Sequence, residues 1–341
     1  MNLQDYADHL ELLGVQALNK RNTTVSFKQC AEYLERVIID ISKSPLIPNT
    51  IAYDWQRFVG SLPSPLPTDI SLIRILEQAR QKLSVLATDI EKQPNVLICT
   101  ALHAEFQALT RKWYGYPDWQ PIESKEPPIL RRRGIYSGLR LLGTTPDTMG
   151  LVHTAIHVTQ ILTTWRPQLA IMIGICGGLP DEVSIGDIIV AEVTFHYQFG
   201  AFKDGKIEYQ LRIESIEEQL KLKLQSIIND EKAVAIQKKL ENLGIKVPEN
   251  PTKMRLGIMG CADLVVKDLS KLKEAKGVDR KVHSIDMESY AFMRACKANG
   301  VPGLVVKVVQ DLIEKKTDEF REYAIAAAGE ACLFLLRELV S

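Results

Sequence analysis

The sequence predicts an α/β fold, a central mixed β-sheet flanked by helices, preceded by a small all-helical N-terminal domain. Two observations lead to this prediction. Apolar residues recur at helical spacing in residues 1–92, where strand-like runs of valine and isoleucine are scarce. From residue 93 onward, short buried apolar runs alternate with amphipathic stretches, as they do in a sheet that helices cover on both faces. We therefore expect two domains, residues 1–92 and 93–341.

The N-terminal domain is expected to contain helices around residues 10–18, 30–38 and 73–90, where apolar residues recur three or four positions apart. The segment SLPSPLP at residues 61–67 is expected to be a loop, because alternate prolines fix φ and remove backbone donors. No polar cluster in this domain resembles a site. We interpret it as a helical adaptor that docks on a homologous helical domain or on another protein partner.

The second domain is expected to alternate strands with helices in an order that can be read from its apolar runs. One strand each is expected at residues 95–100, 170–174, 187–193, 255–259 and 303–309, and at least one at 134–143. The expected helices lie at 105–113, 150–165, 213–243, 287–299 and in a terminal segment ending near residue 339.

Charge and apolar content exclude several classes of function. The 42 basic and 42 acidic residues cancel, so no global field favours a nucleic-acid partner. The longest apolar run, Leu169–Leu179, is far shorter than the ~20 residues that cross a bilayer, and the N-terminus is acidic where a signal peptide would be basic. We therefore expect a cytoplasmic protein that does not bind a membrane. The six cysteines form no C-x-x-C pair, so neither a disulfide nor a zinc site is predicted. We expect no cofactor.

Polar residues follow four of the expected strands, at the ends where ligands bind in open α/β sheets. The four segments are Thr100–Glu105, Gly174–Leu179, Ser284–Ser289 and Lys307–Asp311. Each alone has a simpler explanation: an acidic residue at a helix start, a tight glycine turn, a helix N-terminus or a helix cap. Their joint occurrence at successive strand ends favours a shared site.

These segments resemble the purine nucleoside phosphorylase and nucleosidase superfamily across residues 95–341. The likeness is greatest to methylthioadenosine/S-adenosylhomocysteine nucleosidases and to nucleosidase domains fused to other modules in bacterial signalling and antiphage systems. The matching motifs are Thr100-Ala-Leu-x-x-Glu105, Pro167-x-x-Ala-x-Met-Ile-Gly-Ile-Cys-Gly-Gly178 with Ile185-Gly-Asp-Ile-Ile-Val190, Asp286-Met-Glu288, and Lys307-Val-Val-Gln-Asp311 with Lys316-x-Asp318 and Tyr323-Ala324.

The resemblance implies a role for each matching residue. Asp311 takes the place of the aspartate that protonates or hydrogen-bonds the purine N7, as a general acid. Glu288 matches the glutamate that holds the ribose hydroxyls, Met287 would pack on the ribose, and Glu105 matches the glutamate that aims a water. The resemblance also assigns three further substrate-binding positions, Cys176 and Gly177 in the glycine segment and Val265 where the small nucleosidases stack an aromatic ring on adenine.

The resemblance favours hydrolysis over phosphorolysis. Phosphorylases of this superfamily hold phosphate with an arginine and a serine or threonine at the positions of Met172 and Ile175, neither of which can bind an anion. The expected reaction releases an adenine-type base from a purine nucleoside or nucleotide, as an effector in bacterial signalling or antiphage defence. Two alternatives remain open: a phosphate-dependent phosphorylase, and a catalytically silent nucleotide sensor. Cys261-Ala262 replaces the family's Ser-Gly pair, which leaves the identity of the substrate open.

Three further features have weaker functional interpretations. Arg131-Arg132-Arg133 could clamp phosphates, although a solvated strand edge is the simpler explanation. His153 and His157 share a helix face without a third metal ligand, which favours ordinary polar contacts or a subunit interface. Residues 196–199 lie where the family often places side chains of a neighbouring subunit's pocket. We expect a homo-oligomer.

Overall fold

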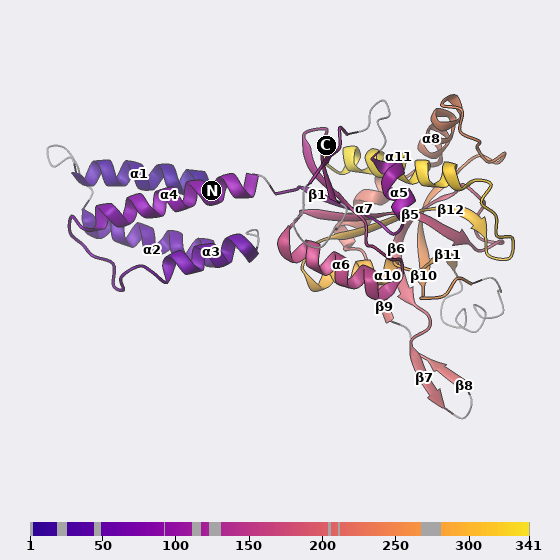
Figure 1. Ribbon diagram of the computed structural model, residues 1–341, viewed down its shortest axis with the longest axis horizontal. Helices are drawn as coiled ribbons and strands as arrows, with labels where there is room; N and C mark the ends of the chain where they lie inside the picture. Colours follow the sequence, from indigo (N-terminus) through magenta and orange to yellow (C-terminus); the bar gives the residue numbers. More distant parts are fainter. Residues whose placement is uncertain are drawn as a thin grey trace. The chain divides into compact units, whose positions relative to one another are not determined.

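The computed structural model describes residues 3–18, 26–43, 49–91, 93–110, 117–122, 131–203, 206–210, 212–266 and 281–340. The chain divides into two compact units, Met1–Gln93 with Thr163–Arg166, and Pro94–Leu162 with Pro167–Ser341. Figure 1 shows the elements of both units. No helix within the described ranges is both long and apolar enough to cross a membrane.

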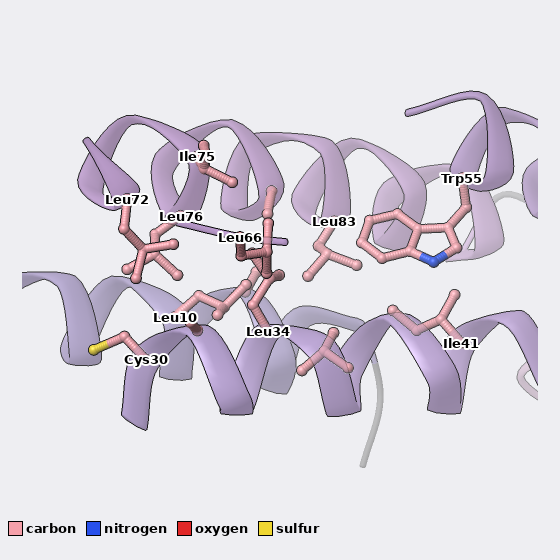
Figure 2. Close-up of a cluster of buried hydrophobic side chains, with 14 of the residues drawn as sticks. Leu10, Cys30, Leu34, Ile41, Trp55, Leu66, Leu72, Ile75, Leu76 and Leu83 are labelled. Carbon is pink, nitrogen blue, oxygen red and sulfur yellow. The ribbon is translucent and has the colours of Figure 1, made fainter. Parts of the chain in front are cut away.

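The N-terminal unit contains α1 (Leu3–Leu18), α2 (Phe27–Lys43), α3 (Asn49–Val59) and α4 (Leu72–Glu91). Their apolar faces meet in a core that includes Leu34, Leu83 and the fully buried Trp55 (Figure 2). The proline-rich segment 61–67 is non-helical, as predicted, and Leu66 within it is buried in the same core. The sequence did not predict α3, because this short helix carries few apolar residues besides its aromatic ones.

The second unit is a mixed sheet flanked by helices, as predicted. Its strands follow the order β11-β10-β6-β12-β5-β1-β4-β3-β2, with β9 on β6 and β7 paired with β8. The strands are β1 (Val96–Thr100), β2 (Gln120–Pro121), β3 (Arg131–Tyr136), β4 (Leu139–Thr144), β5 (Leu169–Gly178), β6 (Ile188–His196), β7 (Gly200–Lys203), β8 (Lys206–Tyr209), β9 (Arg212–Ser215), β10 (Met254–Cys261), β11 (Val282–Asp286) and β12 (Gly303–Leu312).

Helices cover this sheet because their apolar residues pack on its buried strands. α11 packs on β5 and β12, and α10 packs on β6 and β12. Both strands β5 and β12 consist mainly of buried aliphatic residues, the pattern of strands that are covered on both faces. The helices of this unit are α5 (His103–Leu109), α6 (Leu151–Thr164), α7 (Glu218–Ile227), α8 (Asp230–Asn242), α10 (Ser289–Ala298) and α11 (Arg321–Val340).

The sheet closes on itself at the end of β5. β11 runs parallel to β10 on one side, and Ser284 and Ile285 pair antiparallel with Gly178 and Gly177 on the other. β12 also pairs with β5, where Asp311 lies opposite Gly177. This closure brings segments that are more than 100 residues apart in the chain to one point, the glycine end of β5.

The structure corrects several expected elements. β5 continues to Gly178, beyond the strand end expected at residue 174, which excludes the alternative of a strand-to-helix turn there. Asp311 lies within β12, which excludes the alternative of a helix cap. The predicted helical stretch 213–243 is β9 followed by α7 and α8. The segment 134–143, where the sequence predicts at least one strand, belongs to the β3–β4 hairpin. The predicted end of the helix at 105–113 lies partly outside the described residues, because α5 is described to Leu109.

Candidate active site

One pocket at the glycine end of β5 is lined by all seven residues to which the family resemblance gives a catalytic or substrate-binding role. The residues lie on or next to α5, β5, β10, β11 and β12, which Figure 1 shows in the second unit. The pocket also contains Asp286, Lys307, Gln310 and Lys316, for which the sequence predicted no role. The predicted residues that line it are Glu105, Cys176, Gly177, Val265, Met287, Glu288 and Asp311.

Glu105 is fixed by three backbone donors. It lies in the first turn of α5 and is 2% exposed. Its Oε2 accepts hydrogen bonds of 2.9 Å from the N–H groups of Ala101 and Leu102, and its Oε1 accepts one of 2.9 Å from Ile175. The carboxylate is therefore held in one orientation between the end of β1 and the end of β5, without needing another side chain.

Gly174 makes room for this carboxylate. A Cβ built at Gly174 would overlap Oε1 of Glu105 and would lie 2.9 Å from its Oε2. No real Cβ approaches another heavy atom so closely, so any larger residue at this position has to displace Glu105. The glycine that the sequence suggested as a turn residue serves a different purpose, the close approach of a side chain to the strand.

Glu288 is buried beside a lysine. Its Oε1 accepts a hydrogen bond of 3.1 Å from the Gly150 N–H. Its Oε2 lies 3.6 Å from Nζ of Lys307, which lies 3.3 Å from Oδ2 of Asp286. Burial raises the pKa of Glu288 to about 7; Lys307 opposes this shift, whereas Asp286 and Glu105 add to it. The carboxyl group therefore titrates near neutral pH.

Lys307 is fully buried in the middle of β12. Burial alone would lower its pKa, but Asp286, Glu288 and Glu105 outweigh burial and raise the pKa, so the ammonium stays charged. The sequence carried a signal for this residue, because Lys307 interrupts an apolar run of four valines, and a buried charge has to be paired. Its partners could not be identified without the closure of the sheet.

The raised pKa of Glu288 predicts a pH-dependent stability. The unfolded carboxyl loses its proton near pH 4.5 and the folded one near pH 7. The stabilisation from the protonated buried group is therefore complete below pH 4.5 and is lost as pH rises through 7. Relative to Glu288→Gln, which cannot titrate, the wild type should lose on the order of 3 kcal/mol of unfolding free energy over this range. Denaturant titrations of both proteins from pH 4.5 to 8 measure this difference, and a pH-independent difference would contradict the assignment.

Asp311 is paired with a lysine from the segment that follows β12. Nζ of Lys316 donates a hydrogen bond of 2.7 Å to Oδ1 of Asp311, and Nε2 of Gln310 lies 3.5 Å from Oδ2. The Asp311 side chain is 9% exposed and that of Lys316 is 32% exposed. Lys316 belongs to the Lys316-x-Asp318 motif of the family resemblance. Its proximity to Asp311 depends on a turn after β12 that sequence spacing does not define.

The remaining predicted residues form apolar walls. Val265 is exposed at the edge of the pocket, whereas Cys176 is buried, and burial raises the pKa of its thiol to about 12. A protonated thiol in this position is a small apolar surface. Met172 is fully buried in β5, and Ile175 lines the pocket with an apolar side chain, so neither position offers a donor to an anion.

The arginines of residues 131–133 and His157, for which the sequence gave weaker functional interpretations, lie outside this pocket. Arg131, Arg132 and Arg133 are on β3 and do not line it. Nε2 of His157 is 2.8 Å from Thr144 Oγ1, and burial lowers the pKa of His157 to about 4. This buried polar contact is one of the two explanations that the sequence left open. Within the described ranges, no three His, Cys, Asp or Glu side chains gather as metal ligands.

The aromatic residues at positions 196–199 pack outside the pocket. The ring of His196 lies 5.7 Å from that of Tyr290 and 6.3 Å from that of Phe199, and Tyr197 is buried in an apolar cluster. None of the three lines the pocket of this chain. Their expected contribution to a neighbouring subunit stays a prediction.

The sequence is similar to those of two kinds of nucleosidase. Over 257 residues the chain is 26% identical to the ATP nucleosidase Cap17 of Escherichia coli (strain KTE188), which covers 69% of this chain and 50% of the relative. It is 23% identical over 197 residues to the 5'-methylthioadenosine/S-adenosylhomocysteine nucleosidase of Marinomonas sp. (strain MWYL1), covering 56% of this chain and 77% of the relative. The chain thus spans about half the length of Cap17.

Solved structures share the fold. A putative 5'-methylthioadenosine/S-adenosylhomocysteine nucleosidase from Borrelia burgdorferi B31, bound to adenine, superposes with a TM-score of 0.55 at 18% identity, covering 71% of this chain and 99% of that one. The nucleosidase from S. pneumoniae with a transition-state inhibitor gives 0.55 at 18% identity, covering 72% and 99%. The family model of the phosphorylase superfamily matches residues 96–341. The chain therefore belongs to the phosphorylase superfamily.

Proposed function

We propose that this chain hydrolyses the N-glycosidic bond of an adenine-type purine nucleoside or nucleotide and releases the free base. The observation that carries this proposal is the convergence of Glu105, Glu288 and Asp311 on one pocket. Membership of the phosphorylase superfamily supports it, as does similarity to relatives that are named as ATP and 5'-methylthioadenosine/S-adenosylhomocysteine nucleosidases.

Each carboxyl group suits one part of this reaction. When the bond between C1′ and N9 breaks, its electron pair moves into the purine and positive charge develops on the sugar. Glu288, as a carboxylate, accepts hydrogen bonds from the ribose hydroxyls and stabilises that charge. Glu105, held by three N–H groups, orients a water toward C1′ and takes its proton. Asp311 lies at the base end, where it recognises the purine.

The charge of the pocket favours water over phosphate as the nucleophile. Four carboxyl groups line it, and its two lysines are each paired with one or more of them. Such a lining attracts a cationic sugar and repels a phosphate dianion. At the positions where phosphorylases hold phosphate, Met172 is buried and Ile175 is apolar. Val265 and the adjoining Leu264 offer an apolar surface for the base in place of an aromatic ring.

Chromatography of a nucleoside and nucleotide panel, incubated with the full chain in the presence and absence of phosphate, tests this function. We expect free adenine together with free ribose or ribose phosphate carrying only its original 5′ groups, at a rate that phosphate does not change. Formation of ribose 1-phosphate would establish a phosphorylase instead. Tight binding of a nucleotide without base release would establish a silent sensor.

We also propose that the helical N-terminal unit couples this activity to a protein partner in bacterial signalling or antiphage defence, in a cytoplasmic homo-oligomer. Leu12, Val15 and Ile39 support a docking role, because these large apolar side chains are about half exposed. Cells that produce the chain and are challenged with phage should lose adenine nucleosides or nucleotides and accumulate adenine. Cells that produce the Asp311→Asn variant should not, and equal losses in both would refute this role.

A further inference from the structure

The ion pair between Lys316 and Asp311 is built into the pocket by the fold. β12 ends at Leu312, and a bridge between Leu312 and Lys315 turns the chain back. Nε2 of Gln310 then donates hydrogen bonds of 3.0 Å to Thr317 O and 3.1 Å to Asp318 Oδ1, which fix the segment on the far side of the turn. Lys316, between these anchors, extends its ammonium to within 2.7 Å of Asp311 Oδ1.

Gly177 provides the space for this ammonium. A Cβ at Gly177 would lie 3.0 Å from Lys316 Nζ and 3.6 Å from Asp311 Oδ1. The lysine therefore occupies the pocket above the strand that also pairs with Asp311, and its side chain keeps contact with solvent, being 32% exposed. An ion pair on the protein surface would not need a glycine beneath its ammonium group.

The pair complements one edge of adenine. A carboxylate that is engaged by an ammonium has no proton to give and only accepts hydrogen bonds, whereas an ammonium only donates. The edge of adenine that carries N7 presents an acceptor at N7 and a donor at the 6-amino group. An unassisted carboxylate would meet the N7 lone pair with a lone pair of its own, but the Lys316–Asp311 pair offers a donor and an acceptor side by side.

We propose that Lys316 is a further catalytic residue, the hydrogen-bond and proton donor to N7 of the leaving purine, and that Asp311 holds it there while accepting from the 6-amino group. This inference rests on the proposed hydrolysis and refines the role of Asp311 within it. The substrate class it selects is the 6-aminopurines, because a 6-oxopurine would place a second acceptor against the carboxylate.

In the proposed hydrolysis, each bond that breaks and each proton that moves has a defined acceptor. The C1′–N9 bond breaks and its electron pair enters the purine, while a proton moves from Lys316 Nζ to N7 and leaves a neutral amine. Water forms the new C1′–O bond and gives a proton to the Glu105 carboxylate. Protons then pass through solvent from Glu105 to Lys316, which restores both groups. The net reaction consumes one water and yields adenine and the free sugar.

Turnover of two substrates by Lys316→Met separates proton donation from a structural role. Adenosine needs a proton on its leaving group, whereas p-nitrophenyl β-D-riboside releases a stable anion without one. We expect kcat on adenosine to fall by about 10²-fold or more and kcat on the nitrophenyl riboside to change by less than about threefold. Lys315→Met, which removes an exposed neighbouring lysine, is the matched control. Equal losses on both substrates, or no loss on adenosine, would overturn the assignment of Lys316.

Binding of adenine and of 7-deazaadenine, which has a carbon in place of N7, distinguishes this inference from the proposed function. By calorimetry, the wild type should prefer adenine about tenfold or more, and Lys316→Met should lose that preference. If Lys316→Met loses this preference but the wild type cleaves no nucleoside or nucleotide of the panel, hydrolysis is refuted while the base contact of Lys316 stands. If the wild type hydrolyses adenosine and the variant keeps the preference, the contact is refuted while hydrolysis stands. A wild type that neither binds adenine nor releases it from any nucleoside or nucleotide of the panel would overturn both.

Discussion

Replacing Asp311 by asparagine is expected to slow adenine release from adenosine by about 10²- to 10⁴-fold, the range typical of losing acid–base assistance. The neutral amide cannot hold the Lys316 ammonium as a carboxylate does, and its NH₂ group would face the 6-amino group of the base with another donor. The fold should persist, because Asp311 lies at the pocket end of β12 and its side chain bonds only pocket residues in the described contacts.

Steady-state kinetics and thermal unfolding of Asp311→Asn measure these two effects separately. Glu314→Gln, which neutralises an exposed acid three residues further along, is the control for a change of charge in the same segment. We expect the control to retain wild-type kcat. Unchanged turnover of adenosine by Asp311→Asn would remove this residue from the reaction.

Replacing Glu105 by glutamine should reduce kcat by a comparable factor, about 10²- to 10⁴-fold, through loss of the base that activates water. All three backbone partners of Glu105 are donors, so the NH₂ group of a glutamine has to oppose at least one of them and lose its fixed orientation. Adenine affinity should stay within about threefold, because base recognition lies with Asp311 and Lys316. A variant that binds adenine poorly but turns over normally would contradict this division of roles.

The substitution Gly174→Ala should displace the Glu105 carboxylate while leaving the Glu105 side chain itself unchanged. The added methyl overlaps Oε1 of Glu105, so the carboxylate has to move and kcat should fall as in Glu105→Gln. Overpacking of this kind also costs about 1–3 kcal/mol of stability. Gly178→Ala is the matched control, because its Cβ meets Val183 and Val309 at 2.6 and 2.7 Å but no carboxylate. The control should lower stability similarly and leave kcat much closer to wild type.

The candidate site could be predicted from the sequence because it lies where local patterns are strong. The runs Val96–Thr100 and Gly303–Leu312 are apolar enough to identify buried strands, and polar residues at their ends are conspicuous. Ligands bind at such ends whatever the order of strands in the sheet. The family resemblance supplied the expected roles, and the seven residues to which it gave a catalytic or substrate-binding role in this chain all line the pocket.

The partners of Lys307 and the true end of β5 depend on long-range strand pairing, which no local sequence pattern encodes. The closure of β11 on β5 places Asp286 and Glu288 beside Lys307, and only this closure explains how a lysine is accommodated in an apolar strand. The extension of β5 beyond residue 174 could not be predicted for a related reason. Glycine signals a turn or a close approach equally well, and the neighbour that decides between them, Glu105 in the case of Gly174, is distant in sequence.

The convergence of three carboxyl groups on one bound nucleoside is tested most directly by a crystal structure of the chain with an adenosine analogue whose sugar ring carries a protonated nitrogen. We predict Glu288 on the ribose hydroxyls, an ordered water between Glu105 and C1′, and the Lys316–Asp311 pair on the edge of the base that carries N7. A sugar bound away from Glu105 and Glu288, or an anion in the place of that water, would contradict the account.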